Sequence, residues 1–177
     1  MSACAHSSDR NRPKNVSNLD EALIDAITDG DLKTVKTLIS QGADINAAGG
    51  MGYTPLMNAV LSTEEEIAKE LVEKGAEVNA VNLSKRTALY YAIHYELSET
   101  AKLLIKHGAE VNIQDVAGDN PLMEAVRRNN EELVRLLVEN GADVNIKDEK
   151  GRTALDFAKE NNNMKIIEFL KNHAANL

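Results

Sequence analysis

Apolar residues recur along this chain in two alternating patterns, each typical of a short helix. In the first pattern they fall at positions i, i+3 and i+4, as at Leu56, Ala59 and Val60, and so form a stripe along one side of a helix. The second pattern is denser: residues 133–138 (LVRLLV) are apolar around most of a helical turn. Because a helix of the second kind must be covered by neighbours on both sides, the alternation predicts helix pairs packed side by side.

Start and stop signals flank these stripes. Thr54 can act as the N-cap of the first helix, and proline suits its first helical position, as at Pro55 and Pro121. A glycine after each second helix predicts a left-handed C-cap; these glycines are Gly42, Gly75, Gly108 and Gly141. The stretch that follows, such as IKDEKGR at residues 146–152, indicates a hairpin turn that leads to the next helix pair.

The whole pattern has a constant period. GADIN, GAEVN, GAEVN and GADVN begin at residues 42, 75, 108 and 141, and each start lies 33 residues after the one before it. A second series, TPL, TAL, NPL and TAL, begins at residues 54, 87, 120 and 153 and keeps the same step. Two interleaved series in one register indicate an array of repeated units.

In its period and motifs the chain resembles the ankyrin-repeat family over roughly residues 18–176. The resemblance implies an all-α ankyrin-repeat solenoid of stacked helix–turn–helix units with β-hairpin-like tips. We expect five repeats, the first and last acting as caps, at residues 18–48, 49–81, 82–114, 115–147 and 148–177. Lys159 and Lys171 replace apolar residues of the inner repeats, which suits a terminal unit with one face open to water.

Composition narrows the class of protein. With 43% hydrophobic and 27% charged residues, the 177-residue chain is typical of a folded domain. Its net charge of −8 argues against a protein that coats nucleic acid, which would need a basic excess. No apolar run approaches the roughly 20 residues that a membrane span requires. A single cysteine excludes an internal disulfide, so stability must come from packing.

The N-terminal residues leave two localisations open. Residues 1–17 are polar and without periodicity, and we expect them to form a flexible leader. Within them, Ser2-Ala3-Cys4 resembles the end of a bacterial lipoprotein processing signal, although the preceding apolar segment is absent. The sequence favours a cytoplasmic protein. The alternative is an extracytoplasmic lipoprotein anchored through Cys4, with a protective or scaffolding role at the cell envelope.

No catalytic, cofactor or metal site is expected. The four histidines are scattered and show no metal-ligand spacing; they are His6, His94, His107 and His173. Residues 47–52 (AAGGMG) are glycine-rich but lack the lysine of a phosphate-binding loop, and they indicate a hairpin tip. The acidic run at residues 64–66 is interpreted as a solvated helix N-terminus.

Three of the four tyrosines fall within residues 87–95 (TALYYAIHY). On the helix expected there, Tyr91, His94 and Tyr95 stand at i, i+3 and i+4, on a different side from the apolar stripe. Tyr90 takes the place of the histidine in the TPLH motif of the ankyrin family, so we expect it to brace neighbouring units. The alternative interpretation of Tyr91 and Tyr95 is that they pack against the adjacent first helices and shelter them from solvent.

In the ankyrin family, that side of the first helix and the hairpin tips line a concave surface that grips partner proteins. The positions carried over to this chain are Met51, Tyr53, Leu61, Leu83, Arg86, Tyr91, His94, Tyr95, Val116, Arg127 and Arg128. The earlier positions are mostly apolar or aromatic and the last two are basic. The sequence therefore predicts a non-catalytic, monomeric module that binds a protein or peptide partner. The segment of the partner that fits this surface is expected to be amphipathic or acidic.

Overall fold

The computed structural model describes residues 18–174, and these residues form ten helices and no strand. The leader predicted over residues 1–17, including Cys4, and residues 175–177 lie outside the described range. The helices are α1 Asn18–Thr28, α2 Leu32–Ser40, α3 Pro55–Leu61, α4 Glu65–Glu73, α5 Ala88–His94, α6 Ser98–Lys106, α7 Pro121–Arg127, α8 Glu131–Glu139, α9 Ala154–Glu160 and α10 Met164–Ala174.

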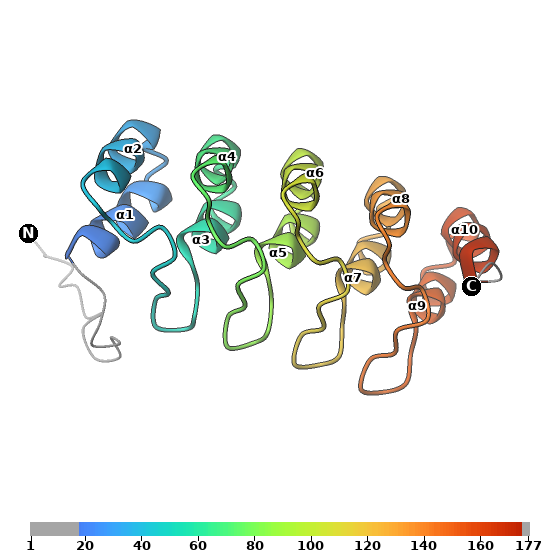
Figure 1. The fold of residues 1–177 in the computed structure, drawn as a ribbon. Coiled ribbons are helices and arrows are strands. Elements are labelled where there is room, and N and C mark those ends of the chain that lie inside the picture. The colour runs from blue at the N-terminus through green and yellow to red at the C-terminus, as the bar shows by residue number, and fades with distance from the viewer. Residues whose placement is uncertain (1–17, 175–177) are drawn as a thin grey trace, which may run out of the picture.

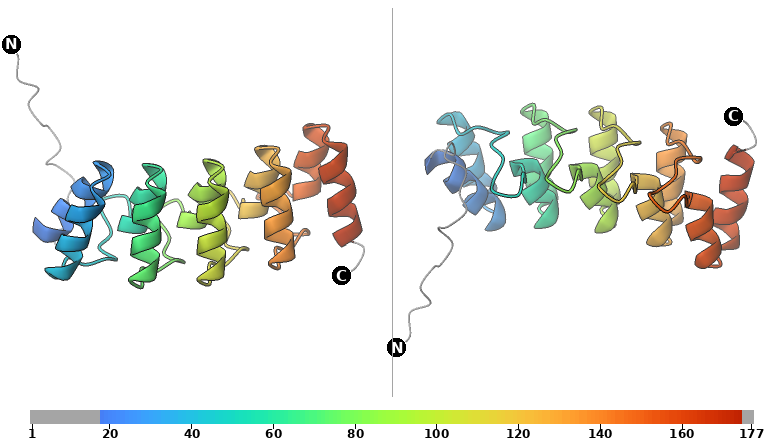
Figure 2. Two further views of the ribbon diagram at one scale, coloured as in Figure 1. Left: turned by 90° about the horizontal axis from the view of Figure 1, so that it is seen from above. Right: turned by 90° about the horizontal axis from the view of Figure 1, so that it is seen from below.

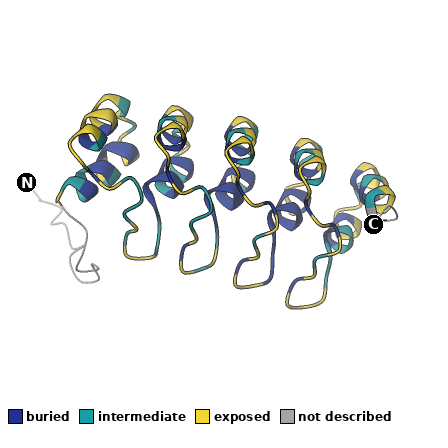
Figure 3. Ribbon diagram, viewed as in Figure 1, coloured by how far each residue is buried: buried dark blue, intermediate teal, exposed yellow. Residues whose placement is uncertain are grey.

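Consecutive helices pair, and the five pairs stand side by side in a single row (Figure 1). The odd-numbered helices form one layer and the even-numbered helices the other, and each helix packs against its neighbours in its own layer (Figure 2). The all-α repeat solenoid predicted from the sequence is confirmed. Burial is most complete on the central odd-numbered helices, where six of the seven residues of α5 and of α7 are buried (Figure 3).

The N-cap predicted at Thr54 is confirmed, and Asn120 caps α7 in the same way. Thr54 Oγ1 accepts a hydrogen bond from the Met57 backbone N–H at 3.2 Å, and Asn120 Oδ1 accepts one from Met123 at 2.9 Å. The glycines that follow α2, α4, α6 and α8 all adopt the left-handed conformation, with φ between +87° and +96°. Each second helix therefore ends where the sequence indicates.

Four loops, which we call fingers, join one helix pair to the next and project beside the odd-numbered layer (Figure 1). They comprise residues 41–54, 74–87, 107–120 and 140–153. Each finger is closed by a backbone hydrogen bond across its tip, such as Asp115 N–H to Asp119 O at 2.8 Å. The tips therefore resemble hairpins, although they contain no assigned strand.

Asparagine side chains fasten successive fingers to one another. Asn46, Asn79 and Asn112 are the last residues of the GADIN-like motifs, and each accepts a hydrogen bond from a backbone N–H in the next finger, at 2.8–2.9 Å. The same position thus performs the same task in each of three units. These links hold neighbouring units in a fixed register and favour a rigid array.

Candidate functional site

The predicted site residues lie on the fingers and on the helices beside them. Met51, Tyr53, Leu83, Arg86 and Val116 belong to fingers, whereas Leu61, Tyr91, His94, Tyr95, Arg127 and Arg128 lie on or next to α3, α5 and α7. Contacts join the two groups: the rings of Tyr53 and Tyr91 are 5.9 Å apart, and Arg127 pairs with Asp119 of the third finger. We call the surface formed by these two groups the inner face.

The first three fingers expose large apolar side chains. Met51, Leu83 and Val116 are 58%, 69% and 51% exposed, and Val81 is nearly half exposed. Backbone hydrogen bonds connect the tips, from Leu83 N–H to Met51 O and from Val116 N–H to Ser84 O, both at 3.1 Å. We call the four apolar residues Met51, Val81, Leu83 and Val116 the fingertip row.

An aromatic cluster lies along α5 and at its C-terminal end. The rings of Tyr90 and Tyr91 meet edge to face at 5.6 Å, and the His94 ring stacks on Tyr90 at 6.1 Å and meets Tyr95 edge to face at 5.1 Å. Tyr95 is 44% exposed, and Leu61 at the end of α3 is half-buried. Of the residues in TALYYAIHY, Tyr95 therefore presents the most aromatic surface to solvent.

Tyr91 differs from the expectation, because it is buried at 6% exposure. The second finger covers its ring edge: Asn82 Nδ2 donates a hydrogen bond to the Tyr91 hydroxyl at 2.7 Å, and that hydroxyl donates to Tyr53 Oη at 3.2 Å. Burial, followed by the hydrogen bond to Tyr53, raises the pKa of Tyr91 to about 12. Tyr91 thus joins finger to helix as a neutral phenol and offers little surface to a partner.

Arg86 bridges two units in a similar way. Its Nε donates a hydrogen bond to Asp115 Oδ2 at 3.0 Å, and its guanidinium lies 4.5 Å from the centre of the Tyr90 ring. Tyr90 is itself buried, and its ring contacts Arg86, Tyr91 and His94 of its own unit. Burial, followed by the charge of Glu124, raises the pKa of Tyr90 to about 12.

Two more arginines stack on one aromatic ring. The guanidinium groups of Arg127 and Arg152 lie 4.7 and 4.4 Å from the centre of the Phe157 ring. Arg127 also pairs with Asp119, and Arg152 donates from Nε and Nη2 to Asp148 Oδ2 at 2.9 and 2.8 Å. Each guanidinium is therefore held by a carboxylate as well as by the ring.

Glu124 lies at the centre of a cluster of charged and polar side chains. Its Oε1 is 2.7 Å from His94 Nδ1 and accepts a hydrogen bond from Arg128 Nε at 3.0 Å, while Arg127 Nε is 3.6 Å from Oε2. Burial opposes ionisation of this carboxyl, but the hydrogen bonds from Arg128 and His94 and the charge of Arg127 outweigh burial. They hold the pKa of Glu124 below its usual value.

The pKa of Asp119 shifts in the opposite direction from that of Glu124. Burial raises the pKa of Asp119, and the charges of Asp115 and Asp148 add to the rise, against the attraction of Arg127. Oδ1 of Asp119 and Nδ2 of Asn120 are buried and have no hydrogen-bond partner within the described residues. Arg127 therefore compensates a carboxylate that is otherwise poorly solvated.

These pairings correct the predicted basic surface at Arg127 and Arg128. The three arginines of the inner face and Arg152 of the adjoining fourth finger each contact a carboxylate whose side chain is at most 10% exposed; the pairs are Arg86–Asp115, Arg127–Asp119, Arg128–Glu124 and Arg152–Asp148. Four positive charges face four negative charges, so they cancel. The carboxylates Asp115 and Asp148 were missed, although Asn82, Asp115 and Asp148 follow one another at steps of 33 residues, which was a readable signal.

That spacing reflects a shared role within the fingers. The side-chain oxygen of Asp148 accepts hydrogen bonds from the backbone N–H groups of Lys150 and Arg152, at 2.9 and 2.8 Å. Asp115 and Asn82 accept the equivalent pairs of bonds in the preceding fingers. The residue that shapes each tip is thus, in two fingers, also the residue that neutralises an arginine.

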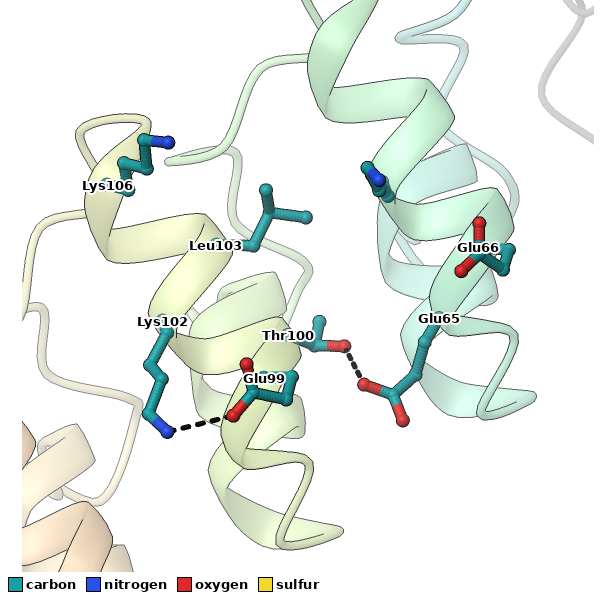
Figure 4. A pocket seen from close by; sticks show the side chains of 8 residues that line it. Glu65, Glu66, Glu99, Thr100, Lys102, Leu103 and Lys106 are labelled. Atoms are coloured by element: carbon teal, nitrogen blue, oxygen red, sulfur yellow. Dashed lines mark hydrogen bonds and ion pairs between the residues drawn. The ribbon is translucent and has the colours of Figure 1, made fainter.

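A hollow on the other layer lies between α4 and α6, away from the fingers (Figure 4). Its polar side chains are largely engaged with one another: Thr100 donates to Glu65 at 2.8 Å, and Lys102 pairs with Glu99 at 2.8 Å. Its lining contains three lysines and three glutamates, together with Thr100 and Leu103. The hollow has no net charge and contains none of the predicted site residues.

No group of three or more His, Cys, Asp or Glu side chains is placed to hold a metal ion within residues 18–174. Of the helices described there, none has both the length and the apolar character that a bilayer span requires.

Replacing Glu124 with glutamine is expected to lower stability at neutral pH and to have little effect in acid. Because the folded state lowers the pKa of Glu124, its stabilising contribution is present above the unfolded-state pKa of about 4.3 and disappears as pH falls through the folded-state value. The expected loss at pH 7 is up to about 1 kcal/mol, since its arginine and histidine partners are one-third exposed.

Urea unfolding of the wild type and of Glu124→Gln at pH 7 and pH 3 measures this difference. Glu139→Gln, on the exposed side of α8, is the matched control and should differ little from the wild type at either pH. A stability gap between wild type and Glu124→Gln that stays constant from pH 7 to pH 3 would contradict the assignment.

The sequence model of a protein family described as "Ankyrin repeats (3 copies)" matches the chain at residues 6–82, 23–115 and 113–177. A comparison with curated proteins gives no match.

Proposed function

Because the chain belongs to the ankyrin-repeat family, whose repeats generally act as protein–protein interaction modules, we propose that its inner face binds a segment of a partner polypeptide. The observation that carries this proposal is the exposure of the fingertip row together with Tyr95. Solvent-exposed apolar side chains gathered on one surface are unfavourable unless a partner covers them. The family is typically non-catalytic, and we propose the same for this chain.

The architecture supports such a role. Each unit packs only against its neighbours, and hydrogen bonds between fingers fix their spacing before any partner arrives. A surface that is already ordered loses little conformational entropy on binding, so more of the contact energy is retained as affinity.

Replacing Tyr95 with alanine is expected to weaken the partner complex by about 2 kcal/mol, or roughly 30-fold in Kd, and to leave folding nearly intact. Its half-exposed ring contacts His94 from the end of α5 and is available to a partner. Affinity capture from the native host with wild type and Tyr95→Ala as baits identifies the partner, and calorimetry on the purified pair then measures Kd.

Met164→Ala is the matched control, because Met164 is 71% exposed at the start of α10, in the layer away from the fingers. It should bind as tightly as the wild type. If Tyr95→Ala lowered the melting temperature in proportion to affinity, Tyr95 would be a packing residue, as the alternative interpretation of the sequence holds.

A further inference from the structure

The charge pattern of the inner face bears on what kind of partner fits there. An acidic segment would suit the basic surface expected from the sequence, but the four arginines already pair with Asp115, Asp119, Glu124 and Asp148. The charge of each guanidinium is therefore already balanced by a largely buried carboxylate, and the surface has little net positive charge to attract an acidic segment.

The fingertip row offers a surface of different chemistry. Its four apolar residues extend over three successive fingers. Among exposed residues at these three tips, Lys85 is the one that carries a charge, because Arg86 is engaged with Asp115. The fourth finger ends the row, since Lys147, Glu149 and Lys150 are exposed at its tip. This stretch, in which Lys85 is the single exposed charge, is thus bounded by the fourth finger.

The repeat spacing limits the conformation of the occupant. Leu83 and Val116 hold the same position in successive units, so they are separated by one repeat, about the 8–10 Å between packed helices. Met51 lies closer to Leu83, because its backbone oxygen accepts a hydrogen bond from the Leu83 N–H at 3.1 Å. A chain in the polyproline II conformation advances about 3.1 Å per residue and returns to the same side every three residues, or about 9 Å. Residues three positions apart in such a chain can therefore meet Leu83 and Val116 in turn.

We propose that the fingertip row binds an uncharged, extended segment of a partner protein that carries an apolar side chain at about every third position. This inference rests on the proposed function and specifies the chemistry of the partner. Leu83, together with the adjoining Met51, contacts one apolar side chain, Val116 contacts the next, and Tyr95 borders the segment on the helix side. The arginines shape the surface through their buried carboxylates and do not attract the partner.

The test is selection from a fully randomised peptide library displayed on phage, with the 177-residue chain as the target. The recovered peptides should be enriched in apolar residues and proline at a spacing of three and depleted in Asp and Glu. Synthetic copies of these peptides should change affinity by less than about twofold between low and high salt. Leu83→Ser should weaken their binding by about tenfold or more, and Met164→Ser should leave it unchanged.

The outcomes separate the two proposals. Peptides rich in Asp or Glu, or with apolar residues at the 3–4 spacing of a helix, that still depend on Leu83 and Tyr95 would overturn this inference and retain the proposed function. Peptides indifferent to both Leu83→Ser and Tyr95→Ala, or no enrichment at all, would overturn the proposed function together with this inference.

Discussion

Leu104→Ala is expected to lower the free energy of unfolding by about 2–5 kcal/mol. Leu104 is completely buried in α6, between the layers of the array. Its backbone oxygen also accepts the N–H of Ala109 at 2.9 Å, which fixes the turn after the helix. The alanine removes three carbon atoms from a site that rigid neighbours on both sides cannot fill, so a cavity remains.

Urea unfolding followed by circular dichroism measures the loss, and Met164→Ala is the exposed control that should change stability by less than about 0.5 kcal/mol. Because each unit is stabilised by its neighbours, amide exchange should accelerate first in α5 and α6 and then in the adjoining pairs. An unchanged urea midpoint for Leu104→Ala would show that the repeat register is wrong.

The 33-residue period was sufficient to predict the fold. It located the helix pairs, the cap at Thr54 and the left-handed glycines, because each of these depends on residues within one unit. Leu104 could be assigned to the interior for the same reason, since its position is apolar in every full repeat. The exposed fingertip residues Met51 and Leu83 were also readable, because hairpin tips project from the array.

Contacts between a helix and the fingers or helices beside it could not be predicted from the same pattern. The periodicity of α5 placed Tyr91 away from the apolar stripe, but the second finger folds back over that side and buries it through Asn82. Likewise Arg86 finds its carboxylate 29 residues further on, and His94 finds Glu124 30 residues further on. A helical pattern describes one helix and its own sides, so it does not reveal what the next finger or helix brings against it.

Fingers also approach one another closely at their backbones, and the approach is tightest at Gly118. Gly118 has φ +77°, and a Cβ at this position would lie 2.8 Å from the backbone nitrogen of Glu149 and 3.0 Å from Asp148 Cα. That nitrogen donates a hydrogen bond to Ala117 O at 3.1 Å, which joins the third finger to the fourth. Backbone atoms cannot move aside as the end of a flexible side chain can, so the fingers would have to separate.

Gly118→Ala is therefore expected to lower the free energy of unfolding by about 2–5 kcal/mol, as the sum of about 1–2 kcal/mol for the left-handed conformation and about 1–3 kcal/mol for the overlap. The chain supplies its own control. Gly151 holds the same position one finger later, with φ +76°, and a Cβ there meets no atom within 4 Å. Gly151→Ala should carry only the conformational part, about 1–2 kcal/mol.

Urea unfolding of the two variants separates the effect of finger contact from that of backbone conformation. Amide exchange at Glu149 provides the local measurement: it should accelerate in Gly118→Ala, where the hydrogen bond to Ala117 is lost, and change much less in Gly151→Ala. Lys85 occupies the equivalent position of the second finger with φ +57°, so an L-residue can adopt this conformation within the array. Equal losses in the two alanine variants would mean that the third and fourth fingers do not constrain each other. The finger spacing would then not be fixed, and the proposal of an ordered inner face would lose its basis.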